Sequence, residues 1–108
     1  MGLTKTEGFT RAQIDLAAFS KALGHPARIA ILQFLASRQS CMCGDIVDEL
    51  PLSQSTVSQH LKELKNVGLI KGNVEGPGVC YCIDEKTWRK IKAALSDLFE
   101  DFDPKNCC

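Results

Sequence analysis

The stretch from Ser53 to Val67, SQSTVSQHLKELKNV, constrains the fold of this chain more than any other. Val57, Leu61 and Leu64 recur at helical spacing, which places them along one face of an amphipathic helix. Ser53 is a favoured residue for the N-cap of such a helix. If the apolar face packs inward, the polar face remains available for a partner.

The polar residues at the start of this helix carry hydroxyl or amide groups and no carboxylate: they are Gln54, Ser55, Ser58 and Gln59. Such side chains suit hydrogen bonds to base edges and to phosphate oxygens. The segment 45–50 shows a shorter helical pattern, and Pro51-Leu52 separates it from Ser53. A helix, a tight break and a second, polar-fronted helix predict a DNA-binding helix-turn-helix. The alternative is an ordinary amphipathic surface helix.

The length of 108 residues indicates one domain with a modest core. The 13 basic and 13 acidic side chains cancel, so no global positive field indicates a nucleic-acid partner. Between residues 53 and 72, Lys62, Lys65 and Lys71 outnumber the single acidic residue Glu63. This local excess supports phosphate contacts by Lys62 and Lys71, although a solvated helix face would show the same excess.

The segment 9–38 predicts two N-terminal helices. The first begins at residue 9 or 10 and ends at Leu23, with Gly24 placed as a C-terminal cap. The second has Pro26 in its first turn and ends near Ser37. His25 lies at the break, where we expect a capping or packing role rather than a ligand role.

The segment 43–67 is assigned to the helix-turn-helix and 69–83 to a β-hairpin, with strands at 69–74 and 79–83. A last helix is expected over 84–102, with Asp84 as its N-cap. Its apolar stripe is Trp88, Ile91, Leu95, Leu98 and Phe102. The stripe either covers the core or joins the first helix in a dimer interface, and we favour the dimer. The expected fold class is mainly α with a small β-hairpin: a dimeric winged helix-turn-helix, as one domain over 1–108.

With these elements in place, the chain resembles the ArsR/SmtB family of metal-responsive winged-helix repressors. The resemblance spans about residues 19–83 and is carried by KALGHPARIAILQFL, by the C-x-C before GDIVDELPLSQSTVSQHLKELKNVGLI, and by CYCI. It implies a homodimer that binds an imperfect inverted repeat of double-stranded operator DNA and leaves it when an inducer ion binds. For His60 a packing role is as much expected as a DNA contact. The candidate DNA-binding residues are Ser53, Gln54, Ser55, Thr56, Ser58, Gln59, His60, Lys62 and Lys71.

The sequence departs from the family pattern in three ways. Where arsenic-sensing members often show C-x-C-x-x-C, the third position here is Ile46. No histidine follows His60, which argues against the histidine-containing site of zinc- and nickel-type members. The hairpin carries Gly76-Pro77-Gly78 and Cys80-Tyr81-Cys82 in place of the family's arginine and paired tyrosines. This hairpin is therefore expected to hold DNA more weakly or to serve the inducer.

Cys41 and Cys43 are the first candidates for inducer ligands, because soft sulfur selects soft ions and a helix N-terminus favours the thiolate. We expect them at the start of the first helix of the helix-turn-helix. Residues two apart on a regular helix point about 200° away from each other. Binding both sulfurs to one ion would then distort that helix and disturb the recognition helix packed against it. Two buried or incidental cysteines are the alternative.

A trivalent arsenic or antimony ion calls for a third sulfur, which Cys107 or Cys108 could supply from the tail of either subunit. Cys80 and Cys82 lie two apart on a strand, so they share a face. They are candidates for a second dithiol site, and small apolar hairpin residues are the alternative. The six cysteines are read as metal ligands or redox-active thiols in a reducing compartment rather than as a disulfide framework.

The sequence thus predicts a repressor released by a thiophilic ion, with arsenite or antimonite as inducer and no organic cofactor. The alternatives keep the DNA site but make cysteine oxidation, persulfidation, or a soft divalent ion such as cadmium or lead the signal. A dithiol enzyme is not expected, since C-x-C lacks the C-x-x-C spacing and no nucleophile and base pair is evident. A winged helix used only for protein association is a further alternative. No signal peptide and no apolar run of about 20 residues is present, so we expect a cytoplasmic protein without membrane contact.

Overall fold

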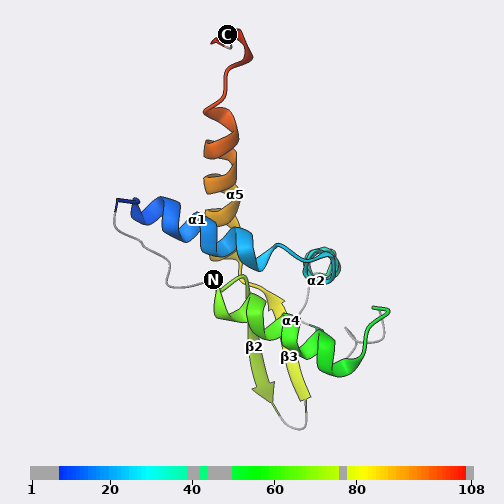
Figure 1. Cartoon of the computed structure of the whole chain (residues 1–108). Helices are drawn as coiled ribbons and strands as arrows, with labels where there is room; N and C mark the ends of the chain where they lie inside the picture. Colours follow the sequence, from blue (N-terminus) through cyan, green and yellow to red (C-terminus); the bar gives the residue numbers. More distant parts are fainter. Residues whose placement is uncertain (1–7, 39–41, 44–49, 76–77, 107–108) are drawn as a thin grey trace.

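The structure is a computed structural model that describes residues 8–38, 42–43, 50–75 and 78–106, with side chains described for all of these except 42–43, 73–75, 78–79 and 106. The elements are α1 (Arg11–Ala22), α2 (Pro26–Ala36), β1 (Met42–Cys43), α4 (Gln54–Asn66), β2 (Ile70–Glu75), β3 (Gly78–Ile83), α5 (Glu85–Glu100) and a short 3-10 turn, η1 (Pro104–Asn106) (Figure 1). The predicted winged-helix order of N-terminal helices, recognition helix, hairpin and last helix is confirmed. The predicted helix over 45–50 lies almost wholly outside the described residues.

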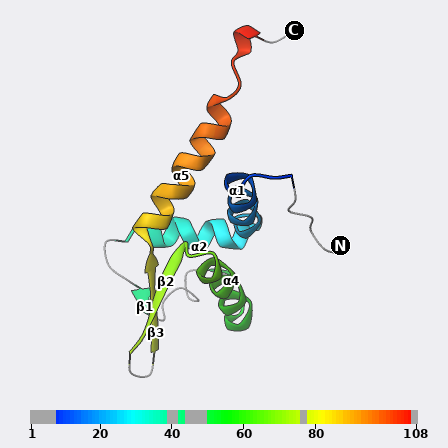
Figure 2. The ribbon, with the colours of Figure 1, turned by 90° about the vertical axis from the view of Figure 1, so that its left-hand side faces the viewer.

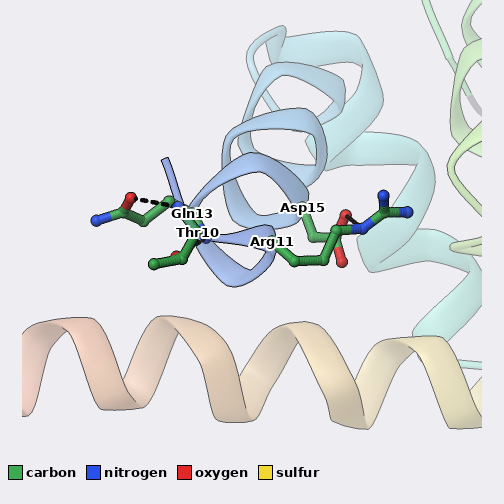
Figure 3. Close-up of polar contacts among 4 residues, drawn as sticks. All are labelled: Thr10, Arg11, Gln13 and Asp15. Carbon is green, nitrogen blue, oxygen red and sulfur yellow. Dashed lines mark hydrogen bonds and ion pairs between the residues drawn. The ribbon is translucent and has the colours of Figure 1, made fainter. Parts of the chain in front are cut away.

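The helix ends follow local signals in the sequence. Thr10 caps α1: its Oγ1 accepts a hydrogen bond from the Gln13 amide at 3.1 Å, and the Gln13 side chain accepts from the Thr10 amide at 2.9 Å (Figure 3). His25 caps α2, with Nδ1 accepting from the Ala27 amide at 3.0 Å. The capping role expected for His25 is therefore confirmed.

The core forms around the apolar stripe of α4. Val57, Leu61 and Leu64 are buried and belong to one core cluster with residues of α2, β2 and α5. The other buried members of this core are Ile31, Leu32, Leu35, Leu69, Ile70 and Ile91. Gly68 has φ +83°, a conformation that favours glycine, and it turns the chain from α4 into β2. The stripe predicted from the sequence is thus the face of α4 that packs inward.

The sheet has three strands in the order β1-β3-β2, all antiparallel. The sequence predicted only the hairpin, and placed Cys43 at the start of a helix. That placement is wrong: Met42–Cys43 is extended and pairs with the free edge of β3, Met42 opposite Tyr81 and Cys43 opposite Cys80 (Figure 2). An unpaired strand edge offers hydrogen-bonding groups to any extended segment that reaches it.

The last helix, α5, extends away from the body of the domain, and α1 packs against it (Figures 1 and 2). Its first half joins the core through buried Ile91 and partly buried Trp88 and Leu95. Beyond them Leu98 is 50% exposed and Phe99 72% exposed. The helix ends at Glu100, so Phe102, predicted to lie on its stripe, falls outside it. The predicted stripe therefore has a covered half and an uncovered half.

The side chain of Leu64 is fully buried, which generates a prediction for stability. Leu64→Ala removes buried methyl groups from the centre of the core and should lower the free energy of unfolding by about 2 to 5 kcal/mol. Urea unfolding followed by circular dichroism measures this loss. Lys65→Ala, at the neighbouring exposed position, is the control and should change stability by less than about 0.5 kcal/mol. Similar losses for both variants would show that the packing face of α4 is misassigned.

Candidate nucleic-acid interface

The first turn of α4 is organised by hydroxyl groups. Ser53 Oγ accepts a hydrogen bond from the Thr56 amide at 3.3 Å, which caps the helix. The same oxygen lies 3.2 Å from Ser55 Oγ and 2.9 Å from Thr56 Oγ1. The positive end of the helix dipole lies at this turn, and helix N-termini are ready sites for phosphate oxygens. The N-terminus of α4 is therefore suited to an anionic backbone.

The outward face of α4 carries the side chains that the sequence proposed for base and phosphate contacts. Gln54, Ser55, Ser58, Gln59 and Lys62 are all exposed. Val57 and Leu61, which alternate with them, are buried, so the polar and apolar faces are sharply separated. Gln59 Nε2 donates to Glu63 Oε1 at 3.4 Å, within its own helix. No carboxylate occurs on this surface before Glu63.

Lys71, the basic residue predicted to reach a phosphate from the hairpin, is exposed on β2. The hairpin follows α4 directly and packs against it through β2. A helix with an exposed polar front and an adjacent hairpin with a lysine form the two parts of a winged-helix DNA surface.

His60 lies on the opposite side of α4 from this surface and is only 7% exposed. Its Nδ1 accepts a hydrogen bond from Arg28 Nε at 3.1 Å, and its ring centroid lies 4.3 Å from that of His25. Arg28 Nη1 also donates to the carbonyl oxygen of Ala22 at 3.2 Å. We therefore remove His60 from the candidate DNA contacts: it joins the recognition helix to the break between α1 and α2.

Burial lowers the pKa of His60, and the nearby His25 and Arg28 lower it further, while Glu63 acts in the opposite direction. The neutral imidazole is the form that accepts the hydrogen bond from Arg28. The role of Arg28 was not predicted from the sequence. Contacts between residues so far apart along the chain leave no periodic signal.

The candidate ligand cysteines are distributed over the sheet and the chain ends. Cys43 is on β1, and Cys80 and Cys82 are on β3, where both are half-buried and disulfide-bonded. The sequence favoured metal ligands or redox-active thiols over a disulfide framework, and two disulfide-bonded cysteines leave the choice among these open. The remaining candidates, Cys41, Cys107 and Cys108, lie outside the described residues. Among the side chains that the structure describes, no group of three or more His, Cys, Asp or Glu residues is placed to hold a metal ion.

The strand at Met42–Cys43 also removes the premise of the predicted switch. The distortion argument required both sulfurs of the C-x-C pair to start on a regular helix, whereas Cys43 is extended. The other cysteine of the pair, Cys41, lies outside the described residues, so the predicted conflict rests on no described helix.

The fold and the exposed recognition helix define the class of protein: a winged helix-turn-helix DNA-binding regulator. A helix-turn-helix domain model matches residues 23–73. The chain is 41% identical over 78 residues to an uncharacterised HTH-type transcriptional regulator of Methanocaldococcus jannaschii, covering 70% of this chain and 86% of that protein. The chain belongs to the ArsR/SmtB family of winged-helix transcriptional regulators, as the resemblance implied.

Two further similarities bear on this family. A homologue of the cadmium resistance regulatory protein CadC from Staphylococcus aureus is 35% identical over 79 residues, covering 72% of this chain and 64% of that protein. A solved structure described as an ArsR-like transcriptional regulator from Rhodococcus sp. RHA1 superposes with a TM-score of 0.71 at 22% identity, covering 89% of this chain and 90% of that one, which shows a shared fold. The family consists of regulators and not of enzymes, so the expectation that the chain is not an enzyme is confirmed. Among the described residues, no helix has the length and hydropathy needed to cross a bilayer.

The buried His60 generates a prediction for pH dependence. In the unfolded chain a histidine binds its proton near pH 6.5, but in the folded protein the pKa of His60 is lower. Between these two values the unfolded state binds more protons, so stability falls as the pH falls. The loss has a ceiling of about 1.4 kcal/mol per pH unit for one proton.

Urea unfolding at about pH 7.5 and about pH 5.5 tests this prediction, since the ordinary histidine pKa lies between them. The control is His60→Gln, which keeps an acceptor for Arg28 and cannot titrate. The variant should lose less stability on acidification than the natural protein. Parallel losses in the two proteins would contradict the assignment.

Proposed function

We propose that this protein is a homodimeric transcriptional repressor that binds operator DNA through α4 and the β2–β3 hairpin, and is released when a thiophilic ion binds its cysteine thiolates. The observation that carries the DNA-binding part is the exposed, carboxylate-free front of α4, fixed outward by the buried stripe on its other side. Because the target is double-stranded DNA, the proposed location is the cytoplasm.

The uncovered half of α5 supports the homodimer. Leu98 and Phe99 are large, exposed apolar side chains on a helix that extends from the domain, and α1 lies against the same helix. Exposed apolar patches of this kind are typical of association surfaces. A twofold dimer through α5 and α1 would present two α4 helices to half-sites about one turn of DNA apart, near 34 Å.

The ion is proposed to be trivalent arsenic or antimony, supplied as arsenite or antimonite, with no organic cofactor. Thiolates prefer soft ions, and this chain has three pairs of closely spaced cysteines. The similarity to a regulator named for cadmium resistance supports a soft ion and keeps cadmium, and with it lead, as the divalent alternatives.

A second candidate function keeps the same DNA surface but uses cysteine oxidation or persulfidation as the signal. The disulfide bonds at Cys80 and Cys82 favour it, because each of these sulfurs is bonded to another sulfur. DNA binding measured under a strong phosphine reductant distinguishes the two candidate functions. Release of DNA by arsenite under these conditions supports the ion, whereas release only after oxidation supports the redox signal.

The DNA surface generates a prediction for affinity. The triple variant Gln54→Ala, Ser58→Ala, Gln59→Ala should weaken binding to a labelled operator fragment by at least about tenfold, since each specific base contact contributes about 1 to 3 kcal/mol. Lys62→Ala should weaken binding to all DNA sequences and reduce the salt dependence of affinity. Fluorescence anisotropy titrations at several salt concentrations measure both effects.

The charge-matched control for Lys62→Ala is Lys86→Ala, an exposed lysine at the start of α5. It should leave both operator affinity and salt dependence unchanged. If the α4 variants bind operator as the natural protein does, α4 is not the recognition helix, and association with a protein becomes the better reading.

The sensor part generates a separate prediction. Arsenite added under reductant should release operator DNA from the natural protein, while the variant Cys41→Ser, Cys43→Ser should bind operator normally and fail to release it. A coupling of about 3 kcal/mol, equivalent to about 150-fold in DNA affinity, suffices for such a response. Antimonite, cadmium, lead and zinc added in turn rank the inducers. Full release in the double variant would exclude this pair as ligands.

A further inference from the structure

The two faces of β3 have different surroundings. Tyr81 and Ile83 belong to the face that packs on the core, and the Tyr81 ring lies so close to Gly72 that an added Cβ there would come within 2.9 Å of it. Cys80 and Cys82 occupy the alternate positions, which belong to the other face. Both are half-buried and neither joins the core cluster. The cysteine face of the sheet is therefore outside the core and within reach of a small solute.

The register of the sheet brings a third cysteine position to this face. β3 is the central strand, and Cys43 on β1 stands directly opposite Cys80. Directly opposed residues of an antiparallel pair lie on the same side of a sheet, with Cβ atoms about 4.5 to 5.5 Å apart. Cys43, Cys80 and Cys82 are thus three neighbouring positions on one face, although they come from two distant C-x-C motifs.

Two further observations concern the chemistry of this face. Cys80 and Cys82 each form a disulfide bond. Two bonded sulfurs lie closer together than two sulfurs that bind the same ion, so each cysteine has a second sulfur near enough to share an ion. On β2, the other strand that neighbours β3, the residue paired with Cys82 is Lys71. The cysteine face of the sheet therefore has a lysine at a position next to the proposed ligands.

We propose that Cys43, Cys80 and Cys82 form one three-thiolate site for trivalent arsenic or antimony, which spans β1 and β3. A thiol reductant first converts the disulfides to thiols: each disulfide takes up two electrons and two protons, and the reductant is oxidised to its own disulfide. Arsenous acid then exchanges three hydroxyl groups for three sulfurs, and each thiol gives its proton to a hydroxyl group that leaves as water. The proposal names the ligands of the inducer and rests on the proposed function for its regulatory meaning.

The site would connect the parts of the protein that contact DNA. β1 precedes the segment that leads to Ser53, the N-cap of α4, whereas β3 belongs to the hairpin and leads directly into α5. An ion held by both strands ties the approach to the recognition helix to the hairpin. It also places the arsenic–sulfur complex at the position paired with Lys71, the hairpin lysine proposed to contact phosphate. Binding at the sheet thus acts on both DNA-contacting elements at once.

Arsenite binding to the full-length protein tests the site directly, under a phosphine reductant that does not itself bind arsenic. Titration is followed by the sulfur-to-arsenic charge-transfer absorption, and X-ray absorption counts the sulfurs around arsenic. Three sulfurs are expected. Cys80→Ser and Cys82→Ser should each weaken binding by at least about 100-fold, since loss of even an outer-shell partner of a metal ligand costs about 10- to 100-fold. The control Cys107→Ser, Cys108→Ser should bind as the natural protein does.

A second measurement avoids substitutions and their effect on folding. Alkylation of the natural protein with iodoacetamide, read by mass spectrometry, should show that arsenite protects Cys43, Cys80 and Cys82 and leaves Cys107 and Cys108 reactive. If the natural protein binds arsenite and releases operator while Cys80 and Cys82 stay reactive, the site is wrong and the proposed function stands. If the natural protein neither binds arsenite nor releases operator, the proposed function fails as well.

Discussion

Burial of the apolar stripe of α4 is the interaction on which both the fold and the DNA surface depend. Val57, Leu61 and Leu64 occupy the centre of the core, and each contributes about 1.5 to 3 kcal/mol by leaving water. The same burial sets the rotation of the helix about its axis, because one residue corresponds to about 100°. The polar front carrying Gln54 and Ser58 then faces solvent as a consequence of packing.

The central position of β3 gives the sheet a role beyond that of a DNA-contacting hairpin. β3 pairs with β2, which follows the recognition helix, and with β1, which precedes the segment leading to it. It also passes into α5, whose exposed Leu98 and Phe99 are proposed to meet a second subunit. A ligand changes DNA affinity only if it binds two arrangements of the protein with different free energies. The sheet is the element that joins the proposed ligand site, the DNA surface and the proposed dimer helix.

The sequence predictions are correct where the interacting residues are near neighbours in the chain, and incomplete where the interacting residues are far apart along it. The predicted caps at Ser53 and Asp84 involve partners three residues away, and the structure confirms both. The strand at Met42–Cys43 was missed, since its partners Tyr81 and Cys80 lie far along the chain and two residues are too few to show an alternating pattern. The packing of His60 against His25 and Arg28 was left open for the same reason.

The sequence alone determined the order of the helices, the hairpin, the inward stripe of α4 and the polar residues opposite that stripe, because helix and strand periodicity are properties of neighbouring residues. Only the tertiary structure decided which way His60 faces, which part of α5 the core covers, and that Cys43 pairs with Cys80 in the sheet. These outcomes depend on packing and strand pairing between segments that are far apart along the chain. The local sequence pattern of one segment does not indicate which distant segment it will contact.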